Sequence, residues 1–125
     1  MKILVVDDNE DALRSYEIGL DSLGEVIIES SPRKAIANFK SYMPDLVITD
    51  LYMPEMNGVD FISHIKKIKP DQMIVVITSF SDDLLLKSDS FLDSNSKARD
   101  IKIFIKPVEI IELLDYIKLL DIRKT

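Results

Sequence analysis

The chain has 125 residues, of which 46% are hydrophobic and 30% charged, a composition ordinary for a single soluble globular domain. It has no cysteine, which excludes disulfides, thiolate metal sites and cysteine catalysis. Its formal net charge of −6 argues against direct binding to nucleic acid, and no apolar run is long enough to span a membrane. Because its first residues run straight into Asp7-Asp8, they lack the shape of a signal peptide, and the expected compartment is the cytoplasm.

Five short runs of mostly apolar residues predict five β-strands. The first, third and fourth are continuous apolar runs, which is typical of buried strands in a parallel sheet covered by helices on both faces. The predicted strands are 3–6, 26–28, 46–48, 73–77 and 101–105. Apolar residues at helical spacing predict five helices between and after them. These helices cover about 9–23, 32–43, 58–69, a segment around 84–86, and 110–120.

Strands and helices alternate, which predicts a doubly wound α/β fold with a parallel sheet and right-handed crossovers. Five strands fit the flavodoxin-like order 2-1-3-4-5, and residues 1–125 are expected to form one domain without repeats or linkers. In this order the first, third, fourth and fifth strands are neighbours, and each ends in polar or charged groups. These groups are Asp7 and Asp8, Asp50, Thr78 and Ser79, and Lys106.

Asp50 ends the third predicted strand, where open α/β sheets bind their ligands. Its carboxylate is a candidate nucleophile that accepts a phosphoryl group. Three carboxylates at one sheet edge would repel each other unless a cation joins them, and oxygen ligands of this kind suit Mg²⁺. Lys106 could hold one phosphoryl oxygen and the Thr78 hydroxyl another, as phosphoryl transfer requires.

Each of these residues also has a structural interpretation. Asp7 or Asp8 could cap the helix that follows, because acids favour the positive end of a helix. Asp50 could begin a loop, Thr78 could be the polar end of a strand, and Lys106 could be an ordinary solvated lysine. The combination on four strand ends favours the functional interpretation.

As a set, these positions resemble a response-regulator receiver domain of two-component signalling, and the resemblance covers essentially the whole chain. The resemblance implies a role for each matched residue. Asp50 would be the phosphoacceptor, and Thr78 and Lys106 would match the family's remaining pair. Asp8 would bind Mg²⁺ directly, Asp7 would bind it more through water, and the Tyr52 backbone carbonyl would be a further metal ligand. The Lys106-Pro107 peptide bond would be cis.

The resemblance also implies partners. A histidine kinase or phosphotransfer protein would present phosphohistidine, and Asp50 would take the phosphoryl group with Mg²⁺ bound. Thr78 would then be drawn towards the phosphate, and the face formed by the fourth helix, fifth strand and fifth helix would change shape. That face would meet a downstream protein and is also where a dimer would form. No enzymatic activity is expected beyond self-phosphorylation and self-dephosphorylation.

The chain departs from the family pattern in two places. Ile103 stands three residues before the lysine, where the family usually carries Tyr or Phe, and Phe104 is expected on the opposite face of the strand. The region of the fourth helix, about 82–100, is polar and atypically long. These departures leave open an alternative, a phosphorylation-independent interaction module. An aspartate-dependent phosphatase is disfavoured, since Tyr52 stands where its second acid would be.

Overall fold

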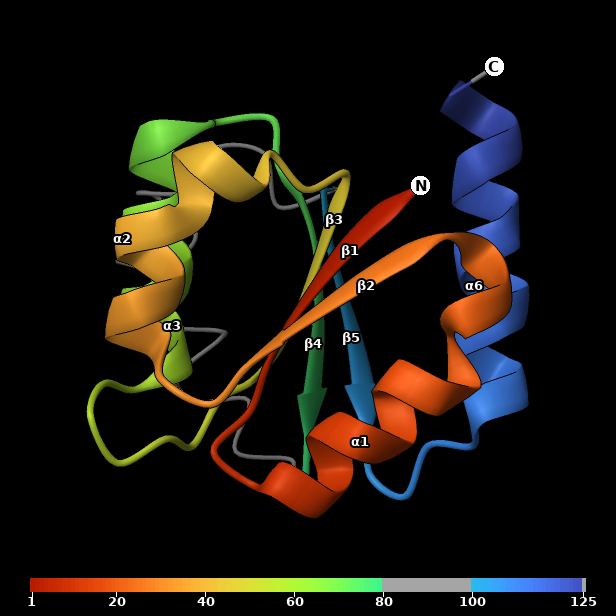
Figure 1. Cartoon of the computed structure of the whole chain (residues 1–125), viewed down its shortest axis with the longest axis horizontal. Helices are drawn as coiled ribbons and strands as arrows, with labels where there is room; N and C mark the ends of the chain where they lie inside the picture. The colour runs from red at the N-terminus through yellow and green to blue at the C-terminus, as the bar shows by residue number, and fades with distance from the viewer. Residues whose placement is uncertain (80–99, 125) are drawn as a thin grey trace.

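A computed structural model describes residues 1–79 and 100–124. They form a five-stranded parallel sheet in the order β2-β1-β3-β4-β5, which confirms the predicted topology (Figure 1). The strands are β1 (Lys2–Val6), β2 (Glu25–Glu29), β3 (Leu46–Asp50), β4 (Met73–Thr78) and β5 (Ile101–Ile105).

Helices cover both faces of the sheet, with α1 and α6 on one side and α2 and α3 on the other (Figure 1). Their bounds are α1 (Glu10–Gly19), α2 (Pro32–Tyr42), α3 (Gly58–Ile68) and α6 (Ile110–Lys124). The predicted helix around 84–86 and the atypical region at about 82–100 lie almost entirely outside the described residues. No helix in the described part of the chain has the length and apolar character needed to cross a lipid bilayer.

The first helix ends earlier than its apolar spacing predicts. α1 stops at Gly19, and a 3₁₀ turn, η1 (Asp21–Leu23), follows it. Its bonds span three residues, from the Leu23 N–H to the Leu20 carbonyl. Asp21 and Ser22 are weak helix formers, which is why the last turn tightens here instead of continuing the α-helix.

The core explains why the strands read as continuous apolar runs. In β1, Leu4 and Val6 pack towards α2 and α3, whereas Ile3 and Val5 pack towards α1 and α6. All four side chains are 0–1% exposed. Since successive strand residues point to opposite faces, a sheet covered on both sides needs apolar residues at every position.

Short polar side chains fix the starts of three helices. The Asn9 side chain accepts a hydrogen bond from the Ala12 N–H at 3.1 Å and caps α1. The side chains of Ser31 and Asn57 cap α2 and α3 in the same way. The cap of α1 is therefore Asn9, and neither Asp7 nor Asp8 has the capping role considered for them.

Gly58 allows α3 to begin directly against the end of β3. Its N–H donates to the Leu51 carbonyl at 2.6 Å, and a Cβ placed on Gly58 would lie 2.6 Å from both the Asp50 carbonyl oxygen and the Leu51 Cα. We expect Gly58→Ala to lower the free energy of unfolding by about 1–3 kcal/mol, because backbone atoms cannot move aside cheaply. Urea denaturation measures this loss.

Gly19→Ala is the matched control for that substitution. A Cβ there would meet only the side chain of Ile110, at 2.9 Å, and a flexible side chain can shift. We therefore expect Gly19→Ala to cost clearly less than Gly58→Ala. Equal losses for the two variants would show that the packing of α3 on β3 is not what Gly58 preserves.

Candidate functional site

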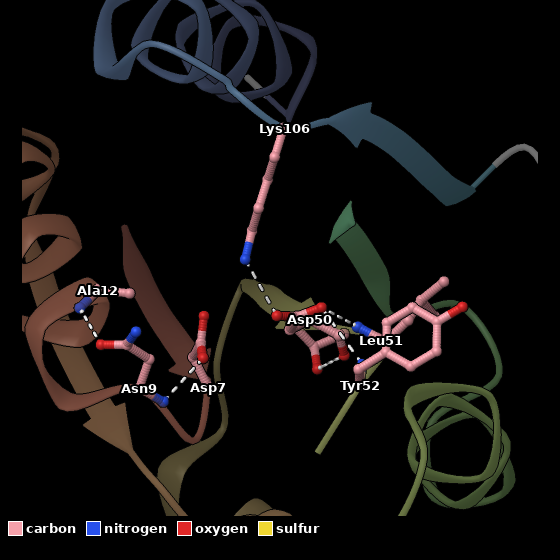
Figure 2. Close-up of polar contacts among 8 residues, drawn as sticks. Asp7, Asn9, Ala12, Asp50, Leu51, Tyr52 and Lys106 are labelled. Carbon is pink, nitrogen blue, oxygen red and sulfur yellow. Dashed lines mark hydrogen bonds and ion pairs between the residues drawn. The ribbon is translucent and has the colours of Figure 1, made fainter. Parts of the chain in front are cut away.

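Four charged side chains meet at the carboxyl ends of the strands. Asp7 and Asp8 follow β1, Asp50 ends β3, and Lys106 follows β5. Each of the three acids offers a carboxylate oxygen, and these oxygens lie within 4.8 Å of one another. Figure 2 shows Lys106 reaching across to Asp50, with Asp7 on the same side of the Asp50 carboxylate as the lysine amine. The parallel order of the sheet brings these residues together, although they are far apart in the sequence.

The Asp50 carboxylate is held at both oxygens. Its Oδ1 accepts hydrogen bonds from the backbone N–H groups of Leu51, at 2.6 Å, and Tyr52, at 3.3 Å (Figure 2). Its Oδ2 lies 3.1 Å from Lys106 Nζ. The Asp50 side chain is 12% exposed, so it is reachable from solvent while its orientation is fixed. A fixed, reachable carboxylate suits a nucleophile.

Lys106 is positioned by the backbone of the neighbouring strand. Its N–H donates to the Thr78 carbonyl at 2.7 Å, and the Lys106-Pro107 peptide bond is cis, as the family resemblance implies. Burial by itself lowers the pKa of Lys106, but the hydrogen bond to Asp50 and the negative charge of Asp50 and Asp7 outweigh it and raise the pKa. Lys106 therefore carries its positive charge at neutral pH.

Asp7 is the buried member of the acidic group. It is 3% exposed, and its Oδ1 accepts a hydrogen bond from the Asn9 N–H at 2.9 Å (Figure 2). Burial raises the pKa of Asp7, and the negative charges of Asp50 and Asp8 add to this effect, against the Asn9 hydrogen bond and the Lys106 charge. Asp8 is exposed. A cation placed among the three carboxylates would relieve this repulsion.

The oxygen spacing fits a magnesium ion. The three carboxylate oxygens lie within 4.8 Å of one another, near enough for one ion with ligands at about 2.1 Å to draw them together. Carboxylate oxygens are also the ligands that Mg²⁺ prefers over softer nitrogen or sulfur donors. The residues present therefore fit this ion.

Comparison with known proteins identifies the family. The match to the response regulator receiver domain family covers residues 3–118. The chain belongs to this family. The response regulator protein VraR of Staphylococcus aureus is 35% identical over 111 residues, which cover 81% of this chain and 53% of the relative. The receiver domain described here thus spans about half the length of the curated relatives it matches.

Solved structures agree with this assignment. The receiver domain resembles a response regulator receiver domain protein from Clostridium thermocellum with a TM-score of 0.80 and 30% identity, over 98% of this chain and 95% of that one. It resembles the response regulator TrrA from Thermotoga maritima, solved in complex with Mg²⁺-BeF, with a TM-score of 0.77 and 28% identity, over 95% and 97% of the two chains. Receiver domains are signalling modules of two-component systems that bind Mg²⁺ at an acidic pocket.

Asp7 provides a test of the acidic pocket of this receiver domain. The folded-state pKa of Asp7 is raised above its ordinary value of 3.8, so ionisation of Asp7 destabilises the fold as the pH rises above 3.8, and the full loss is reached above the folded pKa. We expect Asp7→Asn to raise the free energy of unfolding in EDTA at pH 7 by on the order of 1 kcal/mol, with a smaller gain at pH 4. Urea denaturation at the two pH values measures the difference.

Adding Mg²⁺ should raise the free energy of unfolding more for the wild type than for Asp7→Asn, the opposite of the preference expected in EDTA. The wild type should gain stability with increasing Mg²⁺, because an ion bound only by the folded state stabilises it, and Asp7→Asn should gain less. Asp11→Asn, which removes an exposed acid from the first turn of α1, is the matched control and should respond to Mg²⁺ as the wild type does. An Asp7→Asn variant with a full magnesium response would exclude Asp7 from the ion site.

Thr78 and Tyr52 stand beside the acidic pocket. Thr78 ends β4, is 0% exposed and is joined to Lys106 through its backbone carbonyl. Tyr52 is 40% exposed, and its N–H donates to Asp50. The approach of the Thr78 hydroxyl to a phosphoryl group and the metal contact of the Tyr52 carbonyl stay predictions.

Tyr16 is a neighbour of the pocket that the sequence did not indicate. Burial raises the pKa of its phenol, while the charge of Lys106 lowers it and those of Asp7 and Asp50 raise it further. Its helical spacing in the sequence marked it only as a core residue. The signal that the sequence lacks is spatial, since α1 brings the hydroxyl within electrostatic reach of Lys106 and Asp50.

The switch position of this receiver domain lacks an aromatic ring, and the neighbouring ring faces elsewhere. Phe104 packs towards α1 and α6 and meets the Tyr116 ring edge-on, at a centroid distance of 5.7 Å. Ile103 lies on the opposite face of β5 and is 39% exposed. The prediction that Phe104 cannot take the place of an aromatic at Ile103 therefore agrees with the strand geometry.

Proposed function

We propose that this receiver domain accepts a phosphoryl group on Asp50 from a histidine kinase or phosphotransfer protein, in a reaction that depends on Mg²⁺. The observation that carries the proposal is the position of the Asp50 carboxylate, which lies beside Asp7 and Asp8 and 3.1 Å from Lys106 Nζ. Receiver domains interact with histidine kinases or phosphotransfer proteins, so the donor class follows from the family.

The chemistry is a transfer between two side chains. A carboxylate oxygen of Asp50 attacks the phosphorus, a new O–P bond forms, and the N–P bond of the donor phosphohistidine breaks, leaving its electron pair on the imidazole nitrogen. Lys106 can leave the Asp50 oxygen and donate to a phosphoryl oxygen, since its amine already lies within hydrogen-bonding distance of that carboxylate. The Thr78 hydroxyl would donate to a second phosphoryl oxygen.

Four groups of this chain would hold the ion. We assign direct contacts with the ion to Asp8, Asp50 and the Tyr52 carbonyl. We assign a contact through water to Asp7, because its side chain is more buried than those of Asp8 and Asp50. When bound, Mg²⁺ would neutralise part of the negative charge that the acids and the phosphoryl oxygens share. The Mg²⁺-BeF complex of TrrA, a structure similar over 95% of this chain, supports the binding of Mg²⁺ but does not bear on the individual contacts.

Phosphorylation would signal by changing the shape of the surface formed by β5 and α6. One new anion at Asp50 biases a two-state equilibrium, and Thr78, β5 and α6 would carry the change outward. The side chains of Ile105, Ile111 and Leu119 are 54–57% exposed on β5 and α6, which suits a downstream protein or a dimer partner on this face. We propose that residues 1–125 act as one domain in the cytoplasm, with no activity other than chemistry on Asp50.

The alternative, a receiver-like module that works without phosphorylation, is not favoured. The arguments for it were Ile103 and the region at about 82–100, which lies almost entirely outside the described residues. Against it, the three acids and the lysine lie together at the carboxyl ends of the strands, which supports phosphoryl transfer. A module that had lost the reaction would have no need to keep Asp7 buried beside two other acids, which is an unfavourable place for a carboxylate.

The test is phosphorylation by a small donor. The purified chain is incubated with acetyl phosphate and either Mg²⁺ or EDTA, and its intact mass is measured. We expect one phosphoryl group per chain with Mg²⁺ and none with EDTA. An unchanged mass with Mg²⁺, in a protein that unfolds cooperatively, would refute the proposal and revive the alternative.

A further inference from the structure

A groove lies between the carboxyl-terminal ends of α2 and α3. It encloses about 330 Å³, and Phe39, Met43, Pro44 and Ile68 form its apolar walls. Figure 1 shows these helix ends at the edge of the sheet where β3 and β4 begin, opposite to the ends that carry Asp50 and Lys106. The groove is therefore separate from the phosphoacceptor site.

A buried polar residue, Gln72, lines this groove. Gln72 is 1% exposed, and its Nε2 donates to the backbone carbonyls of Asp45, at 3.3 Å, and Met73, at 3.1 Å. These two acceptors fix which end of the amide is which. Within residues 1–79 and 100–124, the Gln72 Oε1 is a buried side-chain acceptor without a hydrogen-bond donor. An acceptor in this state favours a ligand that supplies an N–H or O–H.

Met43 forms an exposed wall of the groove. It follows α2 with φ 46° and ψ 54°, in the left-handed region where glycine or asparagine fits best. Its side chain is nevertheless large and apolar, and it is 76% exposed. This exposed apolar side chain lines the groove, so a ligand bound there could cover it.

The charge of the groove is positive although the chain carries a net charge of −6. Lys40 and Lys69 line it, and none of the described residues that line it is an acid. Lys40 lies in the last turn of α2, where it also offsets the negative end of the helix, and it remains exposed to a partner. An apolar floor with a basic edge complements an apolar group next to a carboxylate.

We propose that this groove binds a partner polypeptide through one tryptophan side chain flanked by acidic residues. The indole ring would fill the apolar space beside Met43 and Ile68, and its N–H, which can only donate, would reach the Gln72 Oε1. The flanking carboxylates would pair with Lys40 and Lys69. Tryptophan is the side chain that anchors interfaces most strongly, because it combines a large apolar surface with one donor.

The probe is a capped Asp-Trp-Asp tripeptide titrated into the ¹⁵N-labelled chain. We expect saturable NMR shift changes at Met43, Ile68 and the Gln72 side-chain amide, with a Kd on the order of 1 mM, as suits a ligand of this size. Two control peptides should each bind at least about fivefold more weakly: one with 1-methyltryptophan, which lacks the donor, and a Lys-Trp-Lys peptide with the opposite charge. Equal binding by either analogue, or no saturable change, would overturn the proposal.

Met43→Asn tests the wall of the groove without endangering the fold, because asparagine tolerates the left-handed conformation. We expect this variant to unfold at the same or a higher temperature than the wild type and to lose peptide binding. Ile18→Asn, which removes a side chain that is 78% exposed on α1, is the matched control and should bind as the wild type does. Unchanged binding by Met43→Asn would place the peptide elsewhere and sink the inference.

Discussion

Asp50→Asn should abolish phosphoryl incorporation, with a loss of at least about 100-fold relative to the wild type in the presence of acetyl phosphate and Mg²⁺. The amide has nearly the same shape as the carboxylate, and its oxygen can still accept from the backbone N–H groups of Leu51 and Tyr52. It lacks the negative charge that makes the oxygen a nucleophile. Intact mass, followed by mapping of the modified peptide, measures the result.

Asp71→Asn is the matched control for this loss. Asp71 is an exposed acid between α3 and β4, at the opposite edge of the sheet, and its replacement changes the net charge by the same amount. We expect this variant to incorporate phosphate like the wild type. A phosphoryl group on the Asp50→Asn protein would show that another residue is the acceptor.

Lys106→Met should slow phosphoryl incorporation by about 10²-fold while leaving Asp50 in place. The Lys106 amine lies 3.1 Å from Asp50 Oδ2 and stays charged. It is therefore a preorganised cation that can stabilise the negative charge of the phosphoryl oxygens during transfer. Removing one such preorganised group from an active site typically costs 10²–10³ in rate. Methionine keeps the length and apolar stem of the side chain, which limits the effect to the charge.

The rate should be measured at saturating Mg²⁺, because this separates the loss of the amine from any change in ion affinity. Lys102→Met, on β5 just before Lys106, is the matched control. Its amine lies over the rings of Phe104 and Tyr116, at 5.5 and 5.7 Å from their centroids, and is exposed. We expect its rate to stay within about twofold of the wild type, as for other surface substitutions. Similar rates for the two variants would contradict the role given to Lys106.

The strands could be predicted from the sequence because burial on both faces leaves a simple pattern. Continuous apolar runs indicated β1, β3 and β4, which are mostly buried. The outer strands β2 and β5 are less buried, and β5 agrees residue for residue with its prediction although it contains Lys102. The end of α1 could not be found in this way. Leu20 and Leu23 continue the helical spacing, but the backbone tightens after Gly19, and apolar spacing does not report which hydrogen bonds close a turn.

The sequence predicts which residues meet at the site, because they follow neighbouring strands, but it does not predict their burial or their contacts. Strand order alone indicated that Asp7, Asp8, Asp50 and Lys106 should meet, and the structure brings them together. The burial of Asp7 and the capping of α1 by Asn9 depend on side-chain positions that no spacing rule contains. The contact between Gly58 and the carbonyl of Asp50 likewise became visible only in three dimensions.

The groove beside Met43 likewise could not be predicted from the sequence. In the sequence, Met43 and Gln72 appear as the last residue of a helical stripe and a polar residue before a strand. Only the packing of α2 against α3 puts them on one surface, together with Lys40 and Lys69. Periodicity identifies which residues are apolar or buried, but not which buried polar atom lacks a partner.

The most direct measurement of the central claim is a crystal structure of the chain with Mg²⁺ and trifluoroberyllate, which mimics a phosphoryl group. We predict Mg²⁺ at about 2.1 Å from oxygens of Asp8 and Asp50, the beryllium on Asp50, and Lys106 Nζ within hydrogen-bonding distance of a fluoride. Mg²⁺ bound away from these acids, or Lys106 turned to solvent with the fluoride unpaired, would contradict the claim that these four residues form one phosphoryl-accepting site.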